Sequence, residues 1–369
     1  MNIVHITSVH RRKDSRIFYK ECISLKNAGH NVTLLVADGL GNEQIEGINI
    51  LDVGLQPSRI RRLLISSKQI VDKALQLNAD IYHFHDPDLL IQIRRLAKNH
   101  KVIFDSHEDF PKLMLQRDYI PHFLRKILFH LARYIEKKTY KKLSAVVTST
   151  DNIRNKFLSY GHYKTVISVK NFPIVDIYAQ NTEKTFNSEP FSAVYVGGLT
   201  KIRGVEQMIR ACEMANVPLI LAGVFDNPTF EAQMRALNGW KNVEYLGFLP
   251  HKELENKVYN RGQIGLNMLL SAPNHTHSIP IKQLEYMAFG LATISSRHIL
   301  FCDEVVKHTK CGVLVEPEDV KQCAEEIIYL KNHPNEAMKM GKNGKDAVIK
   351  TYNWHKEEQK LIKLYEELG

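Results

Sequence analysis

Short β-rich runs alternate with amphipathic helical segments along the whole chain, and this alternation constrains the fold more than any other feature. The first run, NIVHIT, precedes a helical pattern over residues 14–28, and the run NVTLLVA follows. DIYHFHD, KVIFDSH and SAVVTST continue the series. Strands and helices that alternate in this way build parallel sheets covered by helices on both faces. The sequence therefore predicts an α/β fold.

A second series of the same kind begins after residues 171–190, where proline, asparagine and charged residues break the pattern and predict a linker. Its strand-like runs are FSAVYVGG, VPLILAG, VEYLGF, IGLNML and LATISS, and residues 203–215 form a helical pattern. A chain of 369 residues is also too long for one typical core. We therefore expect an N-terminal domain over residues 1–170, a C-terminal domain over 191–350, and a final helix over 351–369 that packs back on the N-terminal domain. Two Rossmann-like domains that face each other would leave a cleft lined by the carboxyl ends of their strands.

The composition excludes several classes of protein. Apolar residues make up 44% of the chain and charged residues 24%, which is ordinary for a globular protein. No apolar run reaches the roughly 18 residues of a membrane-spanning helix, and the short apolar start precedes basic residues, the reverse of a signal peptide. The five cysteines lack CxxC spacing, which fits a reducing cytoplasm and gives no disulfide or metal signal.

The net charge of +10 is concentrated in the first half of the chain. Residues 1–180 carry 28 Lys and Arg against 17 Asp and Glu, whereas residues 181–369 carry 22 against 23. A basic field on one side indicates an anionic partner, such as a membrane surface, a nucleic acid or a phosphorylated substrate.

The basic excess includes an amphipathic segment over residues 112–143, with nine Lys and Arg against two acidic residues. Its apolar stripe consists of Leu124, Leu128, Leu131 and Ile135. The flanking cations are Arg125, Lys126, Arg133 and Lys137. We expect most of the stripe to lie in the core, as in an ordinary domain helix. The surplus of cations nevertheless suits an anionic membrane surface.

The segment GGLTKIRG, residues 197–204, follows a predicted strand and opens a helix. Gly197 and Gly198 would let backbone N–H groups approach an anion, and the helix N-terminus adds positive potential. Lys201 and Arg203 add two cationic side chains. The segment matches neither GxGxxG nor the phosphate loop GxxxxGK[ST], and a tight turn with solvated charges is the simpler alternative. We interpret it as a candidate phosphate site.

Glu285 stands in the middle of an apolar helical run, in the segment SIPIKQLEYMAFGLATISS. A buried carboxylate without a partner costs several kcal/mol, so either it points away from the core or a ligand holds it. Glutamate can bind both hydroxyls of a ribose. Ser278 is a candidate N-cap and Pro280 falls near the first helical position, so this helix N-terminus, with Lys282, could hold an anion. We favour the ligand over an exposed surface glutamate.

Several long strings together resemble the family 4 glycosyltransferases, which have the GT-B fold. YVGGLTKIRGVEQMI and PIKQLEYMAFGLATISS carry the resemblance in the C-terminal half, and HRRKDSRIFYKECISLKNAGHNVTLL, HFHDPDLL and FDSHEDFP carry it in the N-terminal half. The likeness extends over nearly the whole chain. It implies a retaining hexosyltransferase that takes a nucleotide-diphosphate sugar as donor and works without a cofactor or a bound metal.

The resemblance assigns a cationic pair after the first strand of the C-terminal domain to the donor diphosphate. The usual arginine position is Gly198 here and the usual lysine is Arg203, so we expect Lys201 to supply the missing charge.

The family also carries two glutamates separated by seven residues. The second matches Glu285, which the resemblance assigns to the donor ribose. The first falls at His277, a departure from the pattern at the position that faces the transferred sugar. The nucleobase would lie near Gly247 and Phe248.

His107 directly follows a predicted strand, and the resemblance implies that it contacts the reacting sugar. A histidine capped by Glu108 and Asp109 at a strand end is the simpler alternative.

The loop after the first strand is charged, where the family often has glycines. Its side chains could orient an acceptor hydroxyl, although Asp14 could instead be only the N-cap of the helix over residues 15–28. We predict His107 and Asp14 as catalytic residues, and as acceptor-binding residues His10, Arg11, Arg16 and Glu108.

The string Asp86, Pro87, Asp88 resembles a metal-binding DxD motif. We instead expect Asp86 to be an N-cap, with Pro87 and Asp88 in the first helical turn, where acidic residues complement the helix dipole. We therefore predict no metal site.

The sequence thus predicts a glycosyltransferase that moves a hexose to a surface-glycan or lipid-linked saccharide acceptor, in the biosynthesis of lipopolysaccharide, capsule or exopolysaccharide. We expect it in the cytoplasm, peripherally associated with the inner face of the plasma membrane through its basic N-terminal half. Three alternatives stay open: a nucleotide-sugar epimerase on the same fold, a nucleic-acid-binding protein that lacks a recognisable motif, and a sugar-binding protein without turnover.

Overall fold

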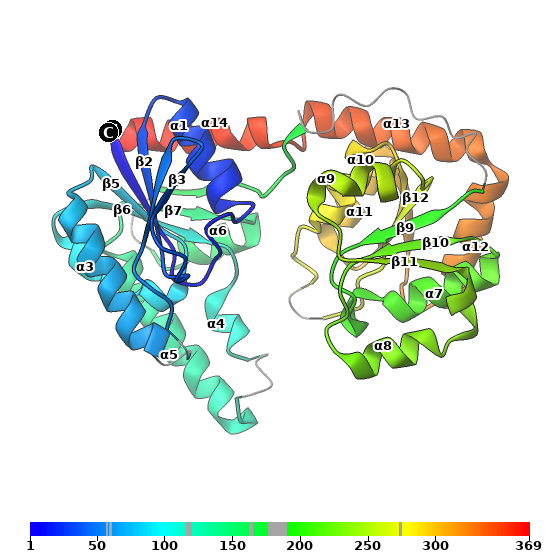
Figure 1. Cartoon of the computed structure of the whole chain (residues 1–369), viewed down its shortest axis with the longest axis horizontal. Coiled ribbons are helices and arrows are strands. Elements are labelled where there is room, and N and C mark those ends of the chain that lie inside the picture. Colours follow the sequence, from blue (N-terminus) through cyan, green and yellow to red (C-terminus); the bar gives the residue numbers. More distant parts are fainter. Residues whose placement is uncertain (57, 59–60, 116–119, 162–164, 176–189, 273–274) are drawn as a thin grey trace. The chain divides into compact units, whose positions relative to one another are not determined.

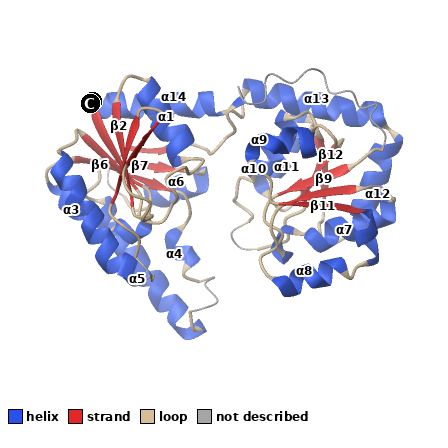
Figure 2. Cartoon of the chain, in the orientation of Figure 1, coloured by secondary structure: helices blue, strands red, loops and turns tan. Residues whose placement is uncertain are grey.

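The computed structural model describes the chain except residues 57, 59–60, 116–119, 162–164, 176–189 and 273–274. Most of the predicted linker over residues 171–190 therefore lies outside the described residues. The chain divides into two compact units: the first comprises Met1–Asn171 and Trp354–Gly369, and the second comprises Phe172–Asn353. Each unit is a sheet between helices (Figures 1 and 2), which confirms the predicted α/β fold with two parallel-sheet domains.

The first unit contains an eight-stranded sheet in the order β3-β4-β2-β1-β5-β6-β7-β8. Its strands are β1 (Asn2–Ile6), β2 (Asn31–Val36), β3 (Glu43–Ile45), β4 (Ile48–Asp52), β5 (Ile81–Phe84), β6 (Lys101–Ser106), β7 (Ala145–Thr148) and β8 (Thr165–Ser168). Among the strand pairs that the described residues form in this sheet, only β3–β4 is antiparallel. The strand order reverses between β1 and β5. Ligands of open α/β sheets bind at such a switch point, beside the carboxyl ends of the strands.

Helices cover both faces of this sheet. They are η1 (Ile17–Cys22), α1 (Ile23–Asn27), η2 (Arg62–Ser66), α3 (Ser67–Leu77), η3 (Pro87–Leu89), η4 (Gln92–Lys98), α4 (Phe110–Leu113), α5 (His122–Tyr140), α6 (Asp151–Leu158) and α14 (Trp354–Leu368). Side chains alternate along β5, so Tyr82 and Phe84 enter the core under α3 and α6, while His83 points to the opposite face. There it reaches Tyr365 of α14, which lies beside α1 (Figure 1).

The helix expected over residues 14–28 begins later and is wound differently. It starts at Ile17 with the π-helical turn η1 and continues as α1. Asp14 and the next two residues form a turn, in which the Asp14 carboxylate accepts the backbone N–H groups of Arg16 (2.8 Å) and Ile17 (2.9 Å). The Asp14 carboxylate thus caps the start of this helix. Capping was the simpler of the two roles that the sequence suggested for Asp14.

The long helix α5 departs in one residue, Leu131, from the expectation that most of its apolar stripe lies in the core. Leu131 is 50% exposed, and it joins a second stripe whose exposed fractions are 74% for Phe123, 60% for Ile127 and 61% for Tyr134. Leu124, Leu128 and Ile135 are only partly exposed. The single acidic residue of α5, Glu136, is buried and bonded to Tyr160 (2.6 Å). The outward face of α5 is therefore apolar and basic.

The second unit contains a six-stranded parallel sheet in the order β11-β10-β9-β12-β13-β14. Its strands are β9 (Ala193–Val196), β10 (Leu219–Ala222), β11 (Val243–Gly247), β12 (Ile264–Asn267), β13 (Ala292–Ser296) and β14 (Gly312–Val315). The order reverses between β9 and β12, so the second switch point lies beside the loops that follow these two strands.

Two helical layers enclose this sheet. They comprise η6 (Lys201–Arg203), α7 (Val205–Ala215), α8 (Pro228–Arg235), η7 (Asn238–Asn242), α9 (His251–Leu254), η8 (Glu255–Tyr259), α10 (Ile281–Ala288), α11 (Leu300–Thr309), α12 (Val320–Asn332) and α13 (Pro334–Lys350). Ala193 and Tyr195 pack in a core with α7 and α12, whereas Val194 and Val196 pack in a core with η8 and α10. None of the helices in the described part of the chain has both the length and the apolar character that crossing a bilayer requires.

Candidate functional site

In the second unit, the loop after β9 brings the predicted glycines and cations together at the switch point. A Cβ atom on Gly198 would lie 3.8 Å from Nε of Arg203, and one on Gly197 would lie 3.8 Å from its Nη1. The guanidinium therefore lies against the two glycines. The side chains of Lys201 and Arg203 are both exposed. The loop thus presents two positive charges beside the carboxyl end of β9.

Gly204 fixes how this loop enters the next helix. Its φ is +72°, and a Cβ atom would lie 2.0 Å from the carbonyl oxygen of Met268, the residue after β12. Only glycine fits there. The cations therefore lie in the 3-10 turn η6, and α7 begins at Val205 instead of at the expected Arg203.

The ends of the neighbouring strands are equally crowded with glycines. The N–H of Gly223 donates to the carbonyl of Gly247 (2.8 Å), and a Cβ atom on Gly223 would lie 1.8 Å from the carbonyl oxygen of Gly197. Gly247 has φ +64°, and Phe248 after it is exposed. Backbone, rather than side chains, forms this edge of the sheet.

Glu285 is buried on α10, with 7% of its surface exposed. Its Oε2 accepts hydrogen bonds from the Tyr259 hydroxyl (2.7 Å) and from Lys282 Nζ (2.6 Å). Lys282 lies one helical turn before Glu285, on the same face. The protein's own side chains therefore explain how an apolar run tolerates this carboxylate.

The start of α10 differs from the prediction. Pro280 is the N-cap residue, whereas the Ser278 hydroxyl donates to the carbonyl of His275 (2.8 Å) and caps nothing. The reason is that Ser278 lies in a preceding turn, two residues before the cap. His277 in that turn is exposed.

In the first unit, Asp86 joins the two loops at the switch point. Its carboxylate accepts from the Thr7 hydroxyl (2.8 Å) and the backbone N–H of Ser8 (2.5 Å), and it pairs with Nδ1 of His10 (2.8 Å). Burial raises the pKa of Asp86, but the bonds from His10, Thr7 and Ser8 outweigh burial and lower the pKa to about 2. Asp86 is the N-cap residue of η3 and Pro87 and Asp88 lie in its first turn, as predicted. Its carboxylate makes no cap hydrogen bond, because it accepts from donors of the loop after β1 instead.

A second buried carboxylate, Asp105 at the end of β6, holds His107. Asp105 Oδ2 lies 2.7 Å from Nε2 of His107, 3.2 Å from Nδ1 of His85 and 2.8 Å from Nε of Arg16. Burial opposes ionisation, but Arg16 and His107 hold the pKa of Asp105 well below its usual value. The rings of His107 and His10 are partly exposed, and their centroids are 5.0 Å apart. Two of the predicted residues thus form a pair, each oriented by a buried aspartate.

Arg16 corrects the expectation of an acceptor-binding residue. Its side chain is inside the unit, with 3% of its surface exposed. Besides the bidentate pair with Asp105, it donates to the carbonyl of Val169 (2.8 Å) and lies 3.0 Å from Glu21. Arg16 is therefore a positioning residue beneath His107. Arg11 and Glu108 are exposed.

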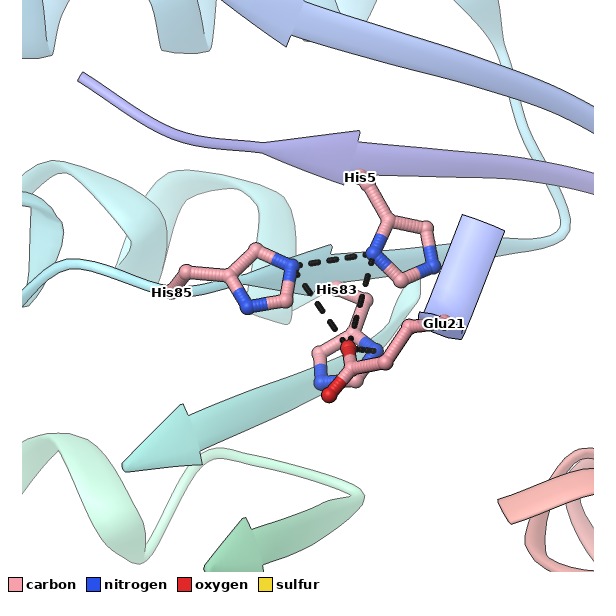
Figure 3. A group of neighbouring side chains, drawn as sticks. All are labelled: His5, Glu21, His83 and His85. Carbon is pink, nitrogen blue, oxygen red and sulfur yellow. Dashed lines mark hydrogen bonds and ion pairs between the residues drawn. The ribbon is translucent and has the colours of Figure 1, made fainter. Parts of the chain in front are cut away.

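A buried polar cluster that the sequence motifs did not predict lies behind this pair. We call it the histidine cluster, and its members are His5 of β1, Glu21 of η1, His83 of β5 and His85 of the loop after β5. Figure 3 shows the four side chains pointing toward one another. Burial lowers the pKa of His5 and His83 well below the usual value and that of His85 to about 4. Burial raises the pKa of Glu21 well above its usual value. The available signal was histidine at alternate positions of a strand, in YHFHD.

Two family models match adjacent parts of the chain. The model described as Glycosyltransferase Family 4 matches residues 15–169, and the model described as Glycosyl transferases group 1 matches residues 177–347. The chain belongs to the group 1 and family 4 glycosyltransferases. The resemblance inferred from the sequence motifs is thereby confirmed.

Two relatives of this glycosyltransferase are distant. It is 23% identical over 267 residues to an uncharacterized glycosyltransferase of Methanocaldococcus jannaschii, covering 67% of this chain and 64% of that protein. It is 23% identical over 190 residues to the amylovoran biosynthesis glycosyltransferase AmsK of Erwinia amylovora, covering 49% and 46%. The matches thus span about half to two thirds of the relatives' length.

Solved structures show the fold of this glycosyltransferase. A sucrose-phosphate synthase from Thermosynechococcus elongatus is similar with a TM-score of 0.74 and 17% identity, over 100% of this chain and 99% of that one. HepE of Anabaena, solved with UDP, has a TM-score of 0.74 and 13% identity over 100% of both chains. HepE solved with UDP-glucose has a TM-score of 0.74 and 14% identity over 100% of both chains. The predicted GT-B fold is confirmed.

Proposed function

We propose that this protein transfers a hexose from a nucleotide-diphosphate sugar to a surface-glycan or lipid-linked saccharide, with retention of configuration. One observation carries the proposal: an exposed cationic loop follows β9 at the switch point, and the helix of Glu285, α10, packs against the end of the same strand, where the N–H of Val196 donates to the Tyr286 hydroxyl (3.3 Å). The name of AmsK supports polysaccharide synthesis, and the UDP-glucose complex of HepE supports a nucleotide-sugar donor.

The donor diphosphate would bind the loop after β9. Gly197 and Gly198 leave its backbone uncovered, and Lys201 and Arg203 supply the positive charge. As the bond between sugar and phosphate breaks, negative charge accumulates on the leaving diphosphate, and preorganised cations stabilise it most at that point. The ribose would bind Glu285 and the base would lie near Phe248, while His277 and Ser278 would line the sugar.

The acceptor would bind the first unit beside His107 and His10. Asp105 holds Nε2 of His107 and Asp86 holds Nδ1 of His10, so each ring is fixed and presents its other edge. A fixed imidazole can orient a sugar hydroxyl. Because Asp14 is engaged in capping, His107 is the better candidate for the reacting sugar, with Arg11 and Glu108 at the rim.

Replacing Glu285 by glutamine tests the donor assignment. A hydrogen bond to a charged group contributes about 1.5–3 kcal/mol, so the dissociation constant of the donor should rise about 10- to 100-fold. Calorimetric titration with UDP-glucose, or with the nucleotide sugar that most raises the melting temperature, measures the change. Glu244→Gln, an exposed glutamate of the same unit paired with Arg261, is the control. Equal donor affinity in both variants would refute the role of Glu285.

We also propose that the outward face of α5 docks on an anionic bilayer. Around Phe123, Ile127, Leu131 and Tyr134 lie exposed cations and a histidine: Lys126, His130, Arg133, Lys137 and Lys138. The apolar stripe can enter the acyl chains of an anionic membrane, while the flanking cations contact its headgroups. Lipid-linked acceptors reside on such a surface, which would place α5 where the substrate is.

Replacing Ile127 by serine should weaken membrane binding by about 10-fold or more, because the free energy of burying one isoleucine is lost. Flotation with phosphatidylcholine vesicles, with and without phosphatidylglycerol, measures it. Binding should require the anionic lipid and fall with added salt. Ile349→Ser is the matched control, since Ile349 is 47% exposed on the second unit. Equal recovery of both variants with the anionic vesicles would contradict docking through α5.

A further inference from the structure

The histidine cluster has the dimensions of a metal site. Nδ1 of His5 lies 2.9 Å from Nε2 of His85. Oε2 of Glu21 lies 4.0 Å from Nδ1 of His5, 4.0 Å from Nδ1 of His83 and 3.9 Å from Nε2 of His85. Ligand atoms around a tetrahedral zinc ion, each about 2.0–2.1 Å from it, are separated by roughly 3.3 Å. The four distances, from 2.9 to 4.0 Å, thus lie on both sides of the spacing that a single ion requires.

The cluster is also short of hydrogen-bond donors, although its residues are fully buried. Among the described residues, neither carboxylate oxygen of Glu21 has a hydrogen-bond partner, and neither does Nε2 of His83. Arg16 lies 3.0 Å from Glu21 but directs its hydrogen bonds to Asp105 and Val169. Buried polar groups of this kind normally have a partner. A cation among the four side chains would satisfy the carboxylate.

Neighbouring groups orient two of the three rings, those of His85 and His5, as the outer shell of a metal site does. Nδ1 of His85 faces Asp105 (3.2 Å), which leaves Nε2 for the ion, and Nε2 of His5 faces the Tyr365 hydroxyl (3.3 Å), which leaves Nδ1. Ligating histidines usually hold their second nitrogen in this way. At His83 the ion would replace the Tyr365 hydroxyl, now 2.8 Å from Nδ1, and Tyr365 would keep its contact with His5.

The net charge of the groups around the cluster favours the binding of a cation. Arg16 and Asp105 form a bidentate pair and neutralise each other. Glu21 is then the anionic ligand, and the three imidazoles bind as neutral ligands. Three imidazoles and one carboxylate suit zinc among the common ions, whereas calcium and magnesium prefer oxygen ligands.

We infer that His5, Glu21, His83 and His85 bind one zinc ion inside the first unit. Because all four side chains are fully buried, the site is closed and its role is structural. The ion would join β1, β5 and η1 beneath the pair of His107 and His10. This inference is independent of the proposed sugar transfer.

A second group, His85, Asp105 and His107, is close enough to be a rival site. Its central carboxylate is already engaged, since both Asp105 oxygens accept from Arg16 and one also meets both histidines. Glu21 has an ion pair with Arg16 (3.0 Å), but neither of its oxygens accepts a hydrogen bond among the described residues. The histidine cluster is therefore the better match for the ion.

The test uses the full-length protein, stripped with a chelator and titrated with zinc by calorimetry. The wild type should bind one zinc ion tightly, and the loaded protein should melt at a higher temperature. X-ray absorption at the zinc edge should show nitrogen and oxygen neighbours with imidazole scattering. His83→Ala and the isosteric Glu21→Gln should each lose at least about 100-fold in affinity, since even outer-shell changes cost 10- to 100-fold.

The melting temperature of each variant with zinc is compared with that of the same variant without zinc. A general loss of stability therefore cannot be mistaken for loss of zinc binding. His308→Ala, a surface histidine of the second unit, should behave as the wild type. His107→Ala should also keep tight binding, which separates the histidine cluster from the rival group. The inference is overturned if the folded, stripped wild type binds no zinc, or if His83→Ala and Glu21→Gln bind it as the wild type does.

Discussion

Replacing Arg203 by alanine is expected to lower kcat/KM for sugar transfer by about 100- to 1,000-fold, the usual cost of removing one preorganised group that stabilises transition-state charge. Arg203 lies against Gly197 and Gly198 and is exposed at the carboxyl end of β9. Its charge would matter most when the diphosphate leaves, so kcat should fall more than donor affinity. Steady-state kinetics with the preferred donor, and calorimetry for its affinity, separate the two quantities.

Arg210→Ala is the matched control for this experiment. Arg210 lies on α7, the helix that follows the cationic loop, and is an exposed residue paired with Glu206 (2.9 Å). Its loss should leave kcat/KM unchanged. Arg203→Lys should recover part of the activity, because a charge remains but the planar guanidinium is lost. Full activity of Arg203→Ala would refute the proposal that the cationic loop stabilises the leaving diphosphate.

Replacing Arg16 by methionine is expected to lower the free energy of unfolding of the first unit by about 3–5 kcal/mol, because a buried charge is left without its partner. The guanidinium forms two bonds with Asp105 (2.8 and 2.9 Å) and one with the carbonyl of Val169 (2.8 Å). Methionine fills much of the same volume. The lost free energy of unfolding should therefore come mainly from the missing charge and less from altered packing.

Urea denaturation followed by tryptophan fluorescence measures this change in one unit. The chain has two tryptophans, Trp354 in the first unit and Trp240 in the second, so in a Trp240→Phe background the signal reports the first unit. Arg261→Met is the control for removal of an exposed ion pair, with Glu244, and should cost no more than about 1 kcal/mol. If Arg16→Met costs no more than Arg261→Met, the buried network adds nothing to stability.

The periodicity of the sequence was sufficient to predict most strands and the repeat of the α/β pattern. Strands that carry a strong apolar signal, such as β1 and β9, are central in their sheets and were predicted. Four strands were not: β3, β4, β8 and β14. Each lies at or next to the edge of its sheet, where burial on both faces is less complete and the apolar pattern is weaker.

The residues proposed for the donor lie in two local motifs, which the sequence alone reveals, whereas those proposed for the acceptor do not. In the first unit the important contacts join distant positions: His10 reaches Asp86, and Arg16 reaches Asp105, which is 89 residues away. A charged residue in a loop was therefore interpreted as exposed when it is buried. Similarly, periodicity showed that α5 is amphipathic, but only packing shows which stripe faces the unit.

The position of α14 in the sequence affects how the protein folds as it is made. A ribosome produces the first unit's sheet before any of residues 172–353, but α14, which supplies Tyr365 to that sheet, emerges only after all of them. The second unit is one continuous stretch and can acquire its native structure while the nascent chain still lacks this helix. The unit whose translation starts first is thus expected to be the last to reach its native state.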